Sequence, residues 1–372
     1  MPLRVPDHIR SIPPYVPGKP IEELERELGI SGSIKLASNE NPLGPCPAAM
    51  QAIEAAAAGL HRYPDGAGHM LIGQLARHLS VEAEQIIIGN GSDEIIAMLC
   101  QTLLGPGDEV LIPQPSFLMY EIATRSMGAT PVFIPLRNLA IDLDDVLASI
   151  GPRTRMVFLC NPNNPTGSII SKSDFKRYLA NLPNHVLTVI DEAYIEFARD
   201  PDCLRGSDYY ASGANLVSLR TFSKLYGLAG LRVGYAMMPG WLAELVNRVR
   251  LPFNVNTLAQ VAAVAALADT DFVRQTLKVV HEGLDYLQSE LSAMGITCFP
   301  TQTNFFLIDV RVDADRVFAH LLREGLIVRS MRAYGYPHYI RINVGRREEN
   351  ARFLEALKKV LRDGDIKGSN VR

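Results

Sequence analysis

The stretch "QIIIGNGSDEIIAMLCQTLL", residues 85–104, contains a short apolar run, a turn with two glycines, and a helical segment that begins at Ser92 and Asp93. A strand that enters a helix through a glycine turn is typical of α/β proteins. Backbone N–H groups at such a helix start can bind an anion. The alternative is a tight turn in which Ser92 and Asp93 only cap the helix. Glu94 occupies the third glycine position of the dinucleotide-binding fingerprint, so the turn does not match that motif.

Further short apolar runs follow this stretch, separated by helical or loop segments. They show no polar alternation, which is typical of strands buried on both faces of a largely parallel sheet. These runs are "EVLIP", "TPVFIP", "RMVFLC", "LTVID", "LVSLRT" and "RVGYAMM". We therefore predict an α/β fold in which residues 45–265 form a large domain, with a mostly parallel central sheet flanked by helices.

The pattern changes towards the C-terminus. "DFVRQTLKVVHEGLDYLQSELSAMG" predicts a long amphipathic helix, and "TNFFLIDV", "LIVRSM" and "YIRINVG" predict strands interleaved with helices. We assign residues 266–372 to a small α+β domain, which has an ordinary domain size. Residues 1–44 are rich in proline, glycine and polar turns, and they predict an arm that packs on another part of the protein.

The composition favours a small-molecule partner. The chain has 372 residues with 37 Lys+Arg and 40 Asp+Glu, so its net charge of -3 suggests neither nucleic acid nor an anionic membrane. The five cysteines form no CxxC pair or metal-ligand spacing, which predicts reduced thiols in the cytoplasm and no metal site. The N-terminus lacks the apolar region of a secretory signal. The most apolar helical stretch, residues 257–269, is too short to cross a bilayer.

Polar residues follow two of the expected buried strands. "NPNNPTG", residues 161–167, comes after "RMVFLC", and Asp191 ends "LTVID". Ligands in open α/β sheets bind beyond the carboxyl ends of the strands. A carboxylate at such a buried position needs a partner, and a cation would provide one. The alternatives are a plain turn at 161–167 and a helix cap at Asp191.

The stretch "TFSKLYGLAGLRVG", residues 221–234, places two hydroxyl residues before Lys224 and an arginine after it. Lys224 is either a solvated surface lysine or an amine that forms a Schiff base. A serine acyl-enzyme motif is a poor match, because position 221 is Thr and neither S-D-N nor K-T-G occurs. Taken together, a phosphate site, Asp191 and Lys224 fit the three handles of pyridoxal 5'-phosphate.

These motifs, in this order and spacing, resemble those of fold-type I pyridoxal-phosphate-dependent aminotransferases, class II. "LASNENPLGP" at 36–45, "HRYPD" at 61–65, "GNGSDE" at 89–94 and "YIRINVG" at 339–345 are similar to the histidinol-phosphate aminotransferase branch. The resemblance covers about residues 8–362. It implies a homodimer in which the arm packs with the small domain and the dimer partner.

The resemblance also implies roles for single residues around the cofactor. Lys224 forms the Schiff base and shuttles the proton, Asp191 pairs with the pyridine nitrogen, and Tyr194 and Asn164 bind the ring hydroxyl. Tyr63 reaches the cofactor phosphate of the partner subunit. The remaining residues form the phosphate site of the same subunit: Ser92, Asp93, Glu94, Thr221, Ser223 and Arg232. The carboxylates of Asp93 and Glu94 are expected to point away from the phosphate or to cap the helix.

The remaining implied site residues are Phe117 and four substrate-binding residues. Phe117 is expected to stack on the pyridine ring, where relatives often have Tyr; taken alone, it is a core aromatic. Arg341 is expected to bind the substrate phosphate or carboxylate with help from Arg329, Tyr15 and Asn41. Arg329 is alternatively a surface ion-pair residue, and Arg332 could take its place.

The implied reaction is ping-pong transamination of L-histidinol phosphate with 2-oxoglutarate, giving imidazole acetol phosphate and L-glutamate in histidine biosynthesis. One alternative is an aminotransferase for aromatic amino acids, and another is threonine-phosphate decarboxylase. A regulatory domain of the same fold is disfavoured, because the residues before the α/β domain are not basic and are too few for a DNA-binding domain.

Overall fold

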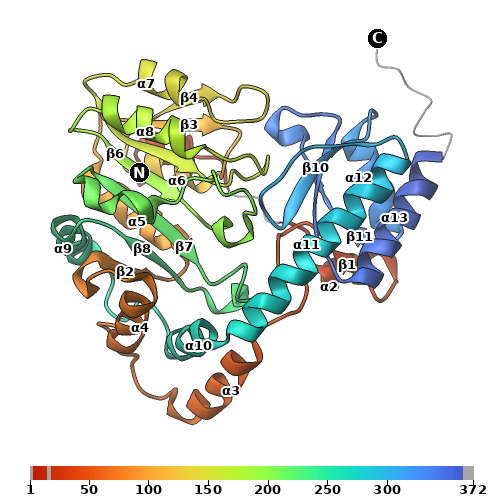
Figure 1. Cartoon of the computed structure of the whole chain (residues 1–372), viewed down its shortest axis with the longest axis horizontal. Helices are drawn as coiled ribbons and strands as arrows, with labels where there is room; N and C mark the ends of the chain where they lie inside the picture. The colour runs from red at the N-terminus through yellow and green to blue at the C-terminus, as the bar shows by residue number, and fades with distance from the viewer. Residues whose placement is uncertain (1–2, 15–17, 363–372) are drawn as a thin grey trace. The chain divides into compact units, whose positions relative to one another are not determined.

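The computed structural model describes residues 3–14 and 18–362 (Figure 1). The chain divides into two compact units. The large unit contains residues 3–14, 45–164 and 168–273, and the small unit contains residues 18–44, 165–167 and 274–362. The segment expected as an arm thus contributes residues 3–14 to the large unit and residues 18–44 to the small one.

The large unit is built on a seven-stranded sheet with the order β2-β8-β7-β6-β5-β3-β4. Its strands are β2 (Ile86–Gly89), β3 (Glu109–Gln114), β4 (Thr130–Pro135), β5 (Thr154–Cys160), β6 (Leu187–Asp191), β7 (Leu216–Thr221) and β8 (Gly234–Met237). β8 is antiparallel to both of its neighbours, and the other neighbouring pairs are parallel. The expected mostly parallel α/β sheet is confirmed.

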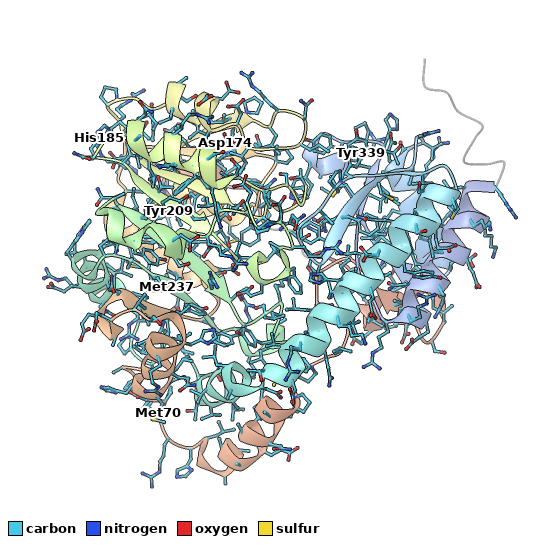
Figure 2. All side chains as sticks on the ribbon, in the orientation of Figure 1. Met70, Asp174, His185, Tyr209, Met237 and Tyr339 are labelled. Carbon is cyan, nitrogen blue, oxygen red and sulfur yellow. The ribbon has the colours of Figure 1, made fainter. Side chains whose placement is uncertain are left out.

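Helices cover both faces of this sheet (Figure 1). The helices of the large unit are α1 (Asp7–Arg10), α3 (Pro47–Ala56), α4 (His69–Leu79), α5 (Ser92–Leu103), α6 (Met119–Ser126), α7 (Leu143–Ala148), α8 (Lys172–Asn181), α9 (Gly240–Val249) and α10 (Thr257–Ala268), followed by the start of α11 (Thr270–Ala293). On one face, Phe175 of α8 packs against strand residues. Tyr209, labelled in Figure 2, meets Phe175 edge-on, with ring centroids 5.0 Å apart.

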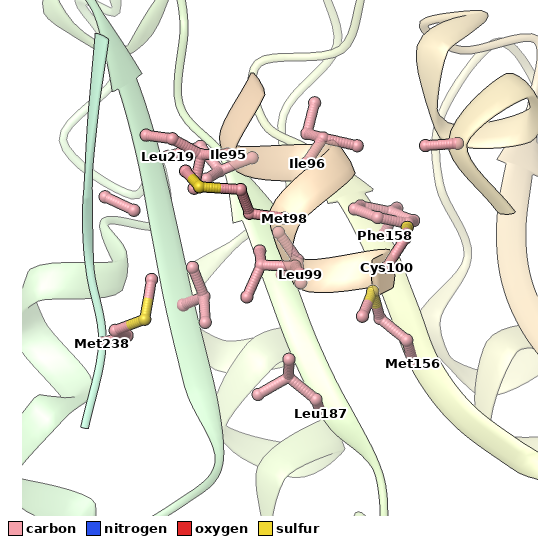
Figure 3. Close-up of a cluster of buried hydrophobic side chains, with 14 of the residues drawn as sticks. Ile95, Ile96, Met98, Leu99, Cys100, Met156, Phe158, Leu187, Leu219 and Met238 are labelled. Atoms are coloured by element: carbon pink, nitrogen blue, oxygen red, sulfur yellow. The ribbon is translucent and has the colours of Figure 1, made fainter. Parts of the chain in front are cut away.

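The opposite face carries the core cluster shown in Figure 3, in which α5 contributes Ile95 and Leu99. Successive strand residues alternate between the two cores. Phe158 of β5 belongs to the cluster with α5, whereas Leu159 belongs to the cluster with α8. Because both faces are buried, most strand positions are apolar, and this explains their largely hydrophobic runs. Ser218 and Arg220 of β7 are buried polar exceptions.

The small unit contains a four-stranded antiparallel sheet with the order β12-β13-β10-β9 and a parallel pair of strands, β1 and β11. These strands are β1 (Ile34–Lys35), β9 (Thr297–Cys298), β10 (Phe305–Asp309), β11 (Leu326–Ile327), β12 (Arg329–Ser330) and β13 (Tyr339–Asn343). Its helices are α2 (Ile21–Leu28), most of α11, α12 (Ala314–Arg323) and α13 (Arg347–Arg362). The run "LIVRSM", expected as one strand, divides at Val328 into strands of two different sheets.

Among residues 3–14 and 18–362, no helix combines the length and the apolar character needed to cross a bilayer.

Candidate active site

The carboxyl ends of β5, β6 and β7 lie side by side at one edge of the large sheet. Cys160, the last residue of β5, is in register with Asp191, the last residue of β6. The Asn161 N–H donates to the Asp191 carbonyl at 2.8 Å, and the Glu192 N–H donates to the Leu219 carbonyl at 2.9 Å. The asparagine loop, the Asp191 carboxylate and the segment that leads to Lys224 therefore leave the sheet together, at the edge where ligands bind in this class of fold.

Asp191 is a buried carboxylate with two hydrogen-bond donors. The residue is only 3% exposed. Oδ1 accepts from the Ala193 N–H at 3.1 Å, and Oδ2 accepts from the Tyr120 hydroxyl at 2.7 Å. Burial raises the pKa of Asp191 to about 6, although the two hydrogen bonds oppose the rise. A nearby cation stabilises the ionised form of such a buried carboxylate.

Lys224 follows β7 and lies beside Tyr194, with its Nζ 5.8 Å from the centroid of the tyrosine ring. Tyr194 and the two hydroxyl residues before the lysine, Thr221 and Ser223, are buried. The Ser223 N–H donates to Thr221 Oγ1 at 3.1 Å, which fixes the turn that carries Lys224.

The start of α5 is a cradle with no room for additional side chains. Gly234 of β8 lies in register between Gly89 of β2 and Thr221 of β7. A Cβ atom on Gly234 would lie 2.6 Å from the Ser92 nitrogen, and one on Gly91 would lie 2.5 Å from Nη2 of Arg232. Glycine at these positions allows the backbone and Arg232 to approach the first turn of α5 closely, and the N–H groups and dipole of a helix start favour an anion.

The two acidic residues of the first turn of α5 are held by other side chains. Asp93 Oδ2 lies 3.1 Å from Arg232 Nη2. Glu94 accepts from the Asn90 N–H at 2.6 Å and from Asn254 Nδ2 at 2.7 Å. Both carboxylates therefore have partners within or beside the turn.

Two asparagines of the loop after β5 have structural partners. Asn161 donates to the Leu204 carbonyl at 2.9 Å and accepts from the Ile170 N–H at 2.7 Å. Asn163 accepts from the Ser116 hydroxyl at 3.2 Å. The Asn164 N–H donates to Cys160 Sγ at 3.4 Å, so the loop turns tightly over the end of β5.

Arg341 of the small unit lies on β13 and is 8% exposed. Its Nη2 donates to the Ala37 carbonyl at 2.6 Å, and its guanidinium carbon lies 5.1 Å from the centroid of the Phe305 ring. Arg329 of β12 is its cross-strand partner. The small unit thus places two arginines opposite each other on neighbouring strands.

Three further residues were considered for substrate binding: Arg332, Asn41 and Tyr15. Arg332 forms ion pairs with Asp313 and Asp315, so its charge is already paired. Asn41 donates to Thr276 Oγ1 at 3.2 Å. Tyr15 lies outside the described residues.

Tyr63 of the large unit is 82% exposed and stacks on Phe253, with the ring centroids 4.7 Å apart. Adjoining apolar side chains on a protein surface often mark a site of interaction with another molecule.

Residues 31–357 match the family model for aminotransferase class I and II. The chain belongs to this family. The aminotransferase is 48% identical to the histidinol-phosphate aminotransferase of Moorella thermoacetica, over 95% of this chain and 92% of that one. It is 45% identical to the enzyme of the same name from Desulfotalea psychrophila, over 97% and 96% of the two chains.

Solved structures agree with this membership. The aminotransferase resembles the histidinol-phosphate aminotransferase of Sinorhizobium meliloti in complex with pyridoxal-5'-phosphate, with a TM-score of 0.89 and 29% identity over 96% of this chain and 98% of that one. It also resembles the L-threonine-O-3-phosphate decarboxylase of Porphyromonas gingivalis, with a TM-score of 0.77 and 25% identity over 89% and 100% of the chains.

Two features of the aminotransferase's site were missed from the sequence. One is Tyr120, the hydrogen-bond partner of Asp191, whose ring also meets Phe117 edge-on at 5.6 Å. Phe117 itself is partly buried against the core. Tyr120 follows Phe117 by three residues, and that helical spacing was the available signal for a contact between their rings.

The second missed feature is a buried charge cluster behind the Asp191 turn. Arg220 Nε donates to Glu192 Oε2 at 3.0 Å, and its Nη1 lies 3.5 Å from Glu196 Oε1. Glu192 Oε1 also accepts from the Gly206 N–H at 2.8 Å. Burial alone would lower the pKa of Arg220, but Glu192 raises it above its ordinary value. The cluster fixes the turn between Asp191 and Tyr194 from behind.

Proposed function

We propose that this aminotransferase converts L-histidinol phosphate and 2-oxoglutarate to imidazole acetol phosphate and L-glutamate in histidine biosynthesis, with pyridoxal 5'-phosphate as its cofactor. The observation that carries the choice of a phosphorylated substrate is the cross-strand pair Arg329 and Arg341. Two planar guanidinium groups suit a doubly charged phosphate. The names of the relatives support the same substrate.

The large unit fits the cofactor. The cradle at the start of α5 suits its phosphate, because glycines keep side chains away and the acidic side chains of the turn are already engaged. Asp191 suits its ring nitrogen, since a buried carboxylate there favours a bound cation. The residues that hold the cofactor in this proposal are Ser92, Asp93 and Glu94 through their amides, together with Phe117, Asn164, Asp191, Tyr194, Thr221, Ser223, Lys224 and Arg232.

When bound, pyridoxal phosphate supplies the electron sink that stabilises negative charge on the carbon from which a proton is removed. The protein supplies the rest. With the cofactor bound, Asp191 would keep the ring nitrogen protonated, and the Lys224 amine would act as the general base and acid that moves the proton of that carbon. Tyr194, buried beside Lys224, orients the ring hydroxyl and limits the positions open to the lysine amine.

The two half-reactions require one anion site for two different anions. Arg341 serves both, because its planar fork binds either a phosphate or a carboxylate through paired N–H groups. Arg329 adds the second positive charge that a phosphate dianion needs. The Ala37 carbonyl and the Phe305 ring hold the Arg341 guanidinium in one orientation.

The aminotransferase acts as a homodimer in this proposal, with Tyr63 reaching the cofactor phosphate of the partner subunit. The exposed Tyr63–Phe253 stack supports this, as do two other apolar side chains of the large unit, Met70 and Leu251, which are 73% and 68% exposed (Figure 2 labels Met70). Association would remove this apolar area from water. We place the enzyme in the cytoplasm, where its five free cysteine thiols stay reduced.

A single-turnover titration tests the function. Histidinol phosphate alone, added to the cofactor-loaded protein, should convert the cofactor to its amino form, and 2-oxoglutarate should reverse the change. Release of CO2 without any need for a keto acid, with threonine phosphate as substrate, would instead identify the decarboxylase reaction. Conversion by aromatic amino acids but not by histidinol phosphate would identify the neighbouring aminotransferase activity.

Lys224→Ala tests the lysine separately. The variant should fold and still bind the cofactor, because the phosphate cradle is intact, but it should lose the visible absorbance of the lysine-linked form. An unchanged spectrum would overturn the assignment. Lys278→Ala, which removes an exposed lysine paired with Glu282, is the matched control.

A further inference from the structure

Tyr120 connects the helix layer of the large unit to the carboxylate of Asp191. It is the second residue of α6 and is fully buried. Its hydroxyl donates to Asp191 Oδ2 at 2.7 Å, while the Ala193 N–H donates to Oδ1 at 3.1 Å. With one donor on each oxygen, the carboxylate has a single favoured orientation.

The tyrosine ring is itself held rigidly. It stacks on Phe158 of β5, with ring centroids 4.5 Å apart and an interplanar angle of 5°. The Thr124 hydroxyl donates to the Tyr120 carbonyl at 2.7 Å. The phenol therefore approaches Asp191 from a fixed position, which is the condition for one side chain to orient another.

The direction of the hydrogen bond is fixed by the neighbouring groups. Burial raises the pKa of the Tyr120 phenol well above its ordinary value, and the negative charge of Asp191 raises it further. Burial likewise raises the pKa of the nearby Cys160 thiol to about 12. Both groups stay protonated at neutral pH, so the tyrosine donates and the carboxylate accepts.

A donor aimed at a buried carboxylate favours its ionised form. Burial works in the opposite direction at Asp191, and so do the charges of Asp93 and Glu192. Without the phenol, Asp191 would hold a proton more tightly. A proton shared between Asp191 and a basic ring nitrogen would then move towards the carboxyl group, and the ring would lose positive charge.

We propose that Tyr120 is a positioning residue of this aminotransferase, whose hydroxyl keeps the Asp191 carboxylate ionised and correctly oriented for the protonated ring nitrogen of the cofactor. This inference rests on the proposed function. It assigns Tyr120 a role through Asp191 and no direct contact with the substrate.

The test compares Tyr120→Phe with Tyr178→Phe. Tyr178 is also fully buried, and its hydroxyl bonds Thr188 Oγ1 at 2.8 Å on the same strand as Asp191. Each protein is loaded with pyridoxal phosphate carrying ¹⁵N in the ring. Wild type and Tyr178→Phe should show the nitrogen signal of a protonated ring, and Tyr120→Phe should shift towards that of a neutral ring. The kcat of Tyr120→Phe should fall about tenfold or more, with little change in KM. Equal signals in the two variants would overturn the proposal.

A double-mutant cycle with Asp191→Asn covers the case in which Tyr120→Phe does not fold. Asparagine removes the buried charge, so Tyr120→Phe/Asp191→Asn should fold. If Tyr120 acts through Asp191, loss of the hydroxyl should change neither the nitrogen signal nor kcat in this background. A further drop in kcat there would show a merely structural role. Failure of the wild-type protein to bind the cofactor would refute the proposed function itself, which separates the two failures.

Discussion

Arg329 and Arg341 are directly opposite each other on the antiparallel strands β12 and β13. Like charges directly opposite each other destabilise a sheet. In the part of the chain that the structure describes, no carboxylate forms an ion pair with Arg329. A bound dianion would attract both guanidinium groups and offset their mutual repulsion. Phosphate binding in the proposed function therefore accounts for the pair.

Arg329→Gln should therefore weaken phosphate recognition without unfolding the protein. We expect the KM for histidinol phosphate to rise about tenfold or more, because one charge-assisted interaction is lost. The variant without substrate should be as stable as the wild type or slightly more stable. Inorganic phosphate should raise the wild-type Tm more than that of the variant, since it binds the folded state through both arginines.

Arg332→Gln is the control for this prediction. Arg332 is paired with Asp313 and Asp315 and is half-exposed, so its loss should leave the KM for histidinol phosphate unchanged. If Arg332→Gln raised the KM and Arg329→Gln did not, phosphate binding would be assigned to Arg332 instead of Arg329.

Asp191→Asn should stabilise the cofactor-free protein at neutral pH. The folded state raises the pKa of Asp191 from 3.8 to about 6, so the ionised carboxylate is disfavoured in the folded protein. The wild type accordingly keeps its full stability at this site below the unfolded pKa and loses it as the pH rises towards the folded pKa. The loss amounts to about 3 kcal/mol above that range and about half as much at pH 5.

Urea unfolding of the two cofactor-free proteins at pH 7.5 and pH 5 measures this gap. The variant should be the more stable one at both pH values, with the larger advantage at pH 7.5. Its cofactor affinity should fall at the same time, because the partner of the ring nitrogen is gone. Equal free energies of unfolding at pH 7.5 would contradict the raised pKa.

Arg220→Met should be strongly destabilising, because it leaves the buried Glu192 carboxylate without its cation. Removing one partner of a buried ion pair costs about 3–5 kcal/mol. Arg248→Met breaks an ion pair of similar length, 2.7 Å to Glu244, whose side chains are 68% and 70% exposed. That surface pair should contribute less than about 1 kcal/mol. Similar losses in denaturant unfolding would show that the Arg220 cluster is not an essential part of the folded core.

The sequence predicted the strand end and the helix start that carry candidate site residues. Asp191 ends a buried strand, and Ser92 begins a helix after a glycine turn; both features are visible as local pattern changes. Tyr120 was not foreseen, because its partner is 71 residues away in the chain and its own surroundings read as an ordinary helix. Arg220 lies within a run that predicts a strand, and nothing local in the sequence indicates that Glu192 lies beside it.

Strand divisions were equally hard to foresee. "LIVRSM" has a continuous apolar start, but Leu326 and Ile327 pair with β1, whereas Arg329 and Ser330 pair with β13. Only the distant partner strands decide where the run is divided, and hydrophobic periodicity carries no information about them.

Gly91→Ala should reduce cofactor affinity, whereas a glycine substitution with comparable backbone strain elsewhere should not. Gly91 has φ of 81°, and an added Cβ would lie 2.5 Å from Nη2 and 3.2 Å from Cζ of Arg232. The clash involves the far end of a flexible side chain, so Arg232 can move aside, but it then leaves Asp93 and the phosphate cradle.

Gly107→Ala is a matched control, because Gly107 has φ of 96° and no atom within 4 Å of an added Cβ. Both variants should lose about 1–3 kcal/mol of stability, because each substitution forces a side chain into a backbone conformation that L residues rarely adopt. Only Gly91→Ala should raise the Kd for pyridoxal phosphate, by about tenfold, which is the effect of losing one charged contact. Titration of the cofactor-free proteins with pyridoxal phosphate would check this, and an equal Kd in both variants would exclude Arg232 from the phosphate site.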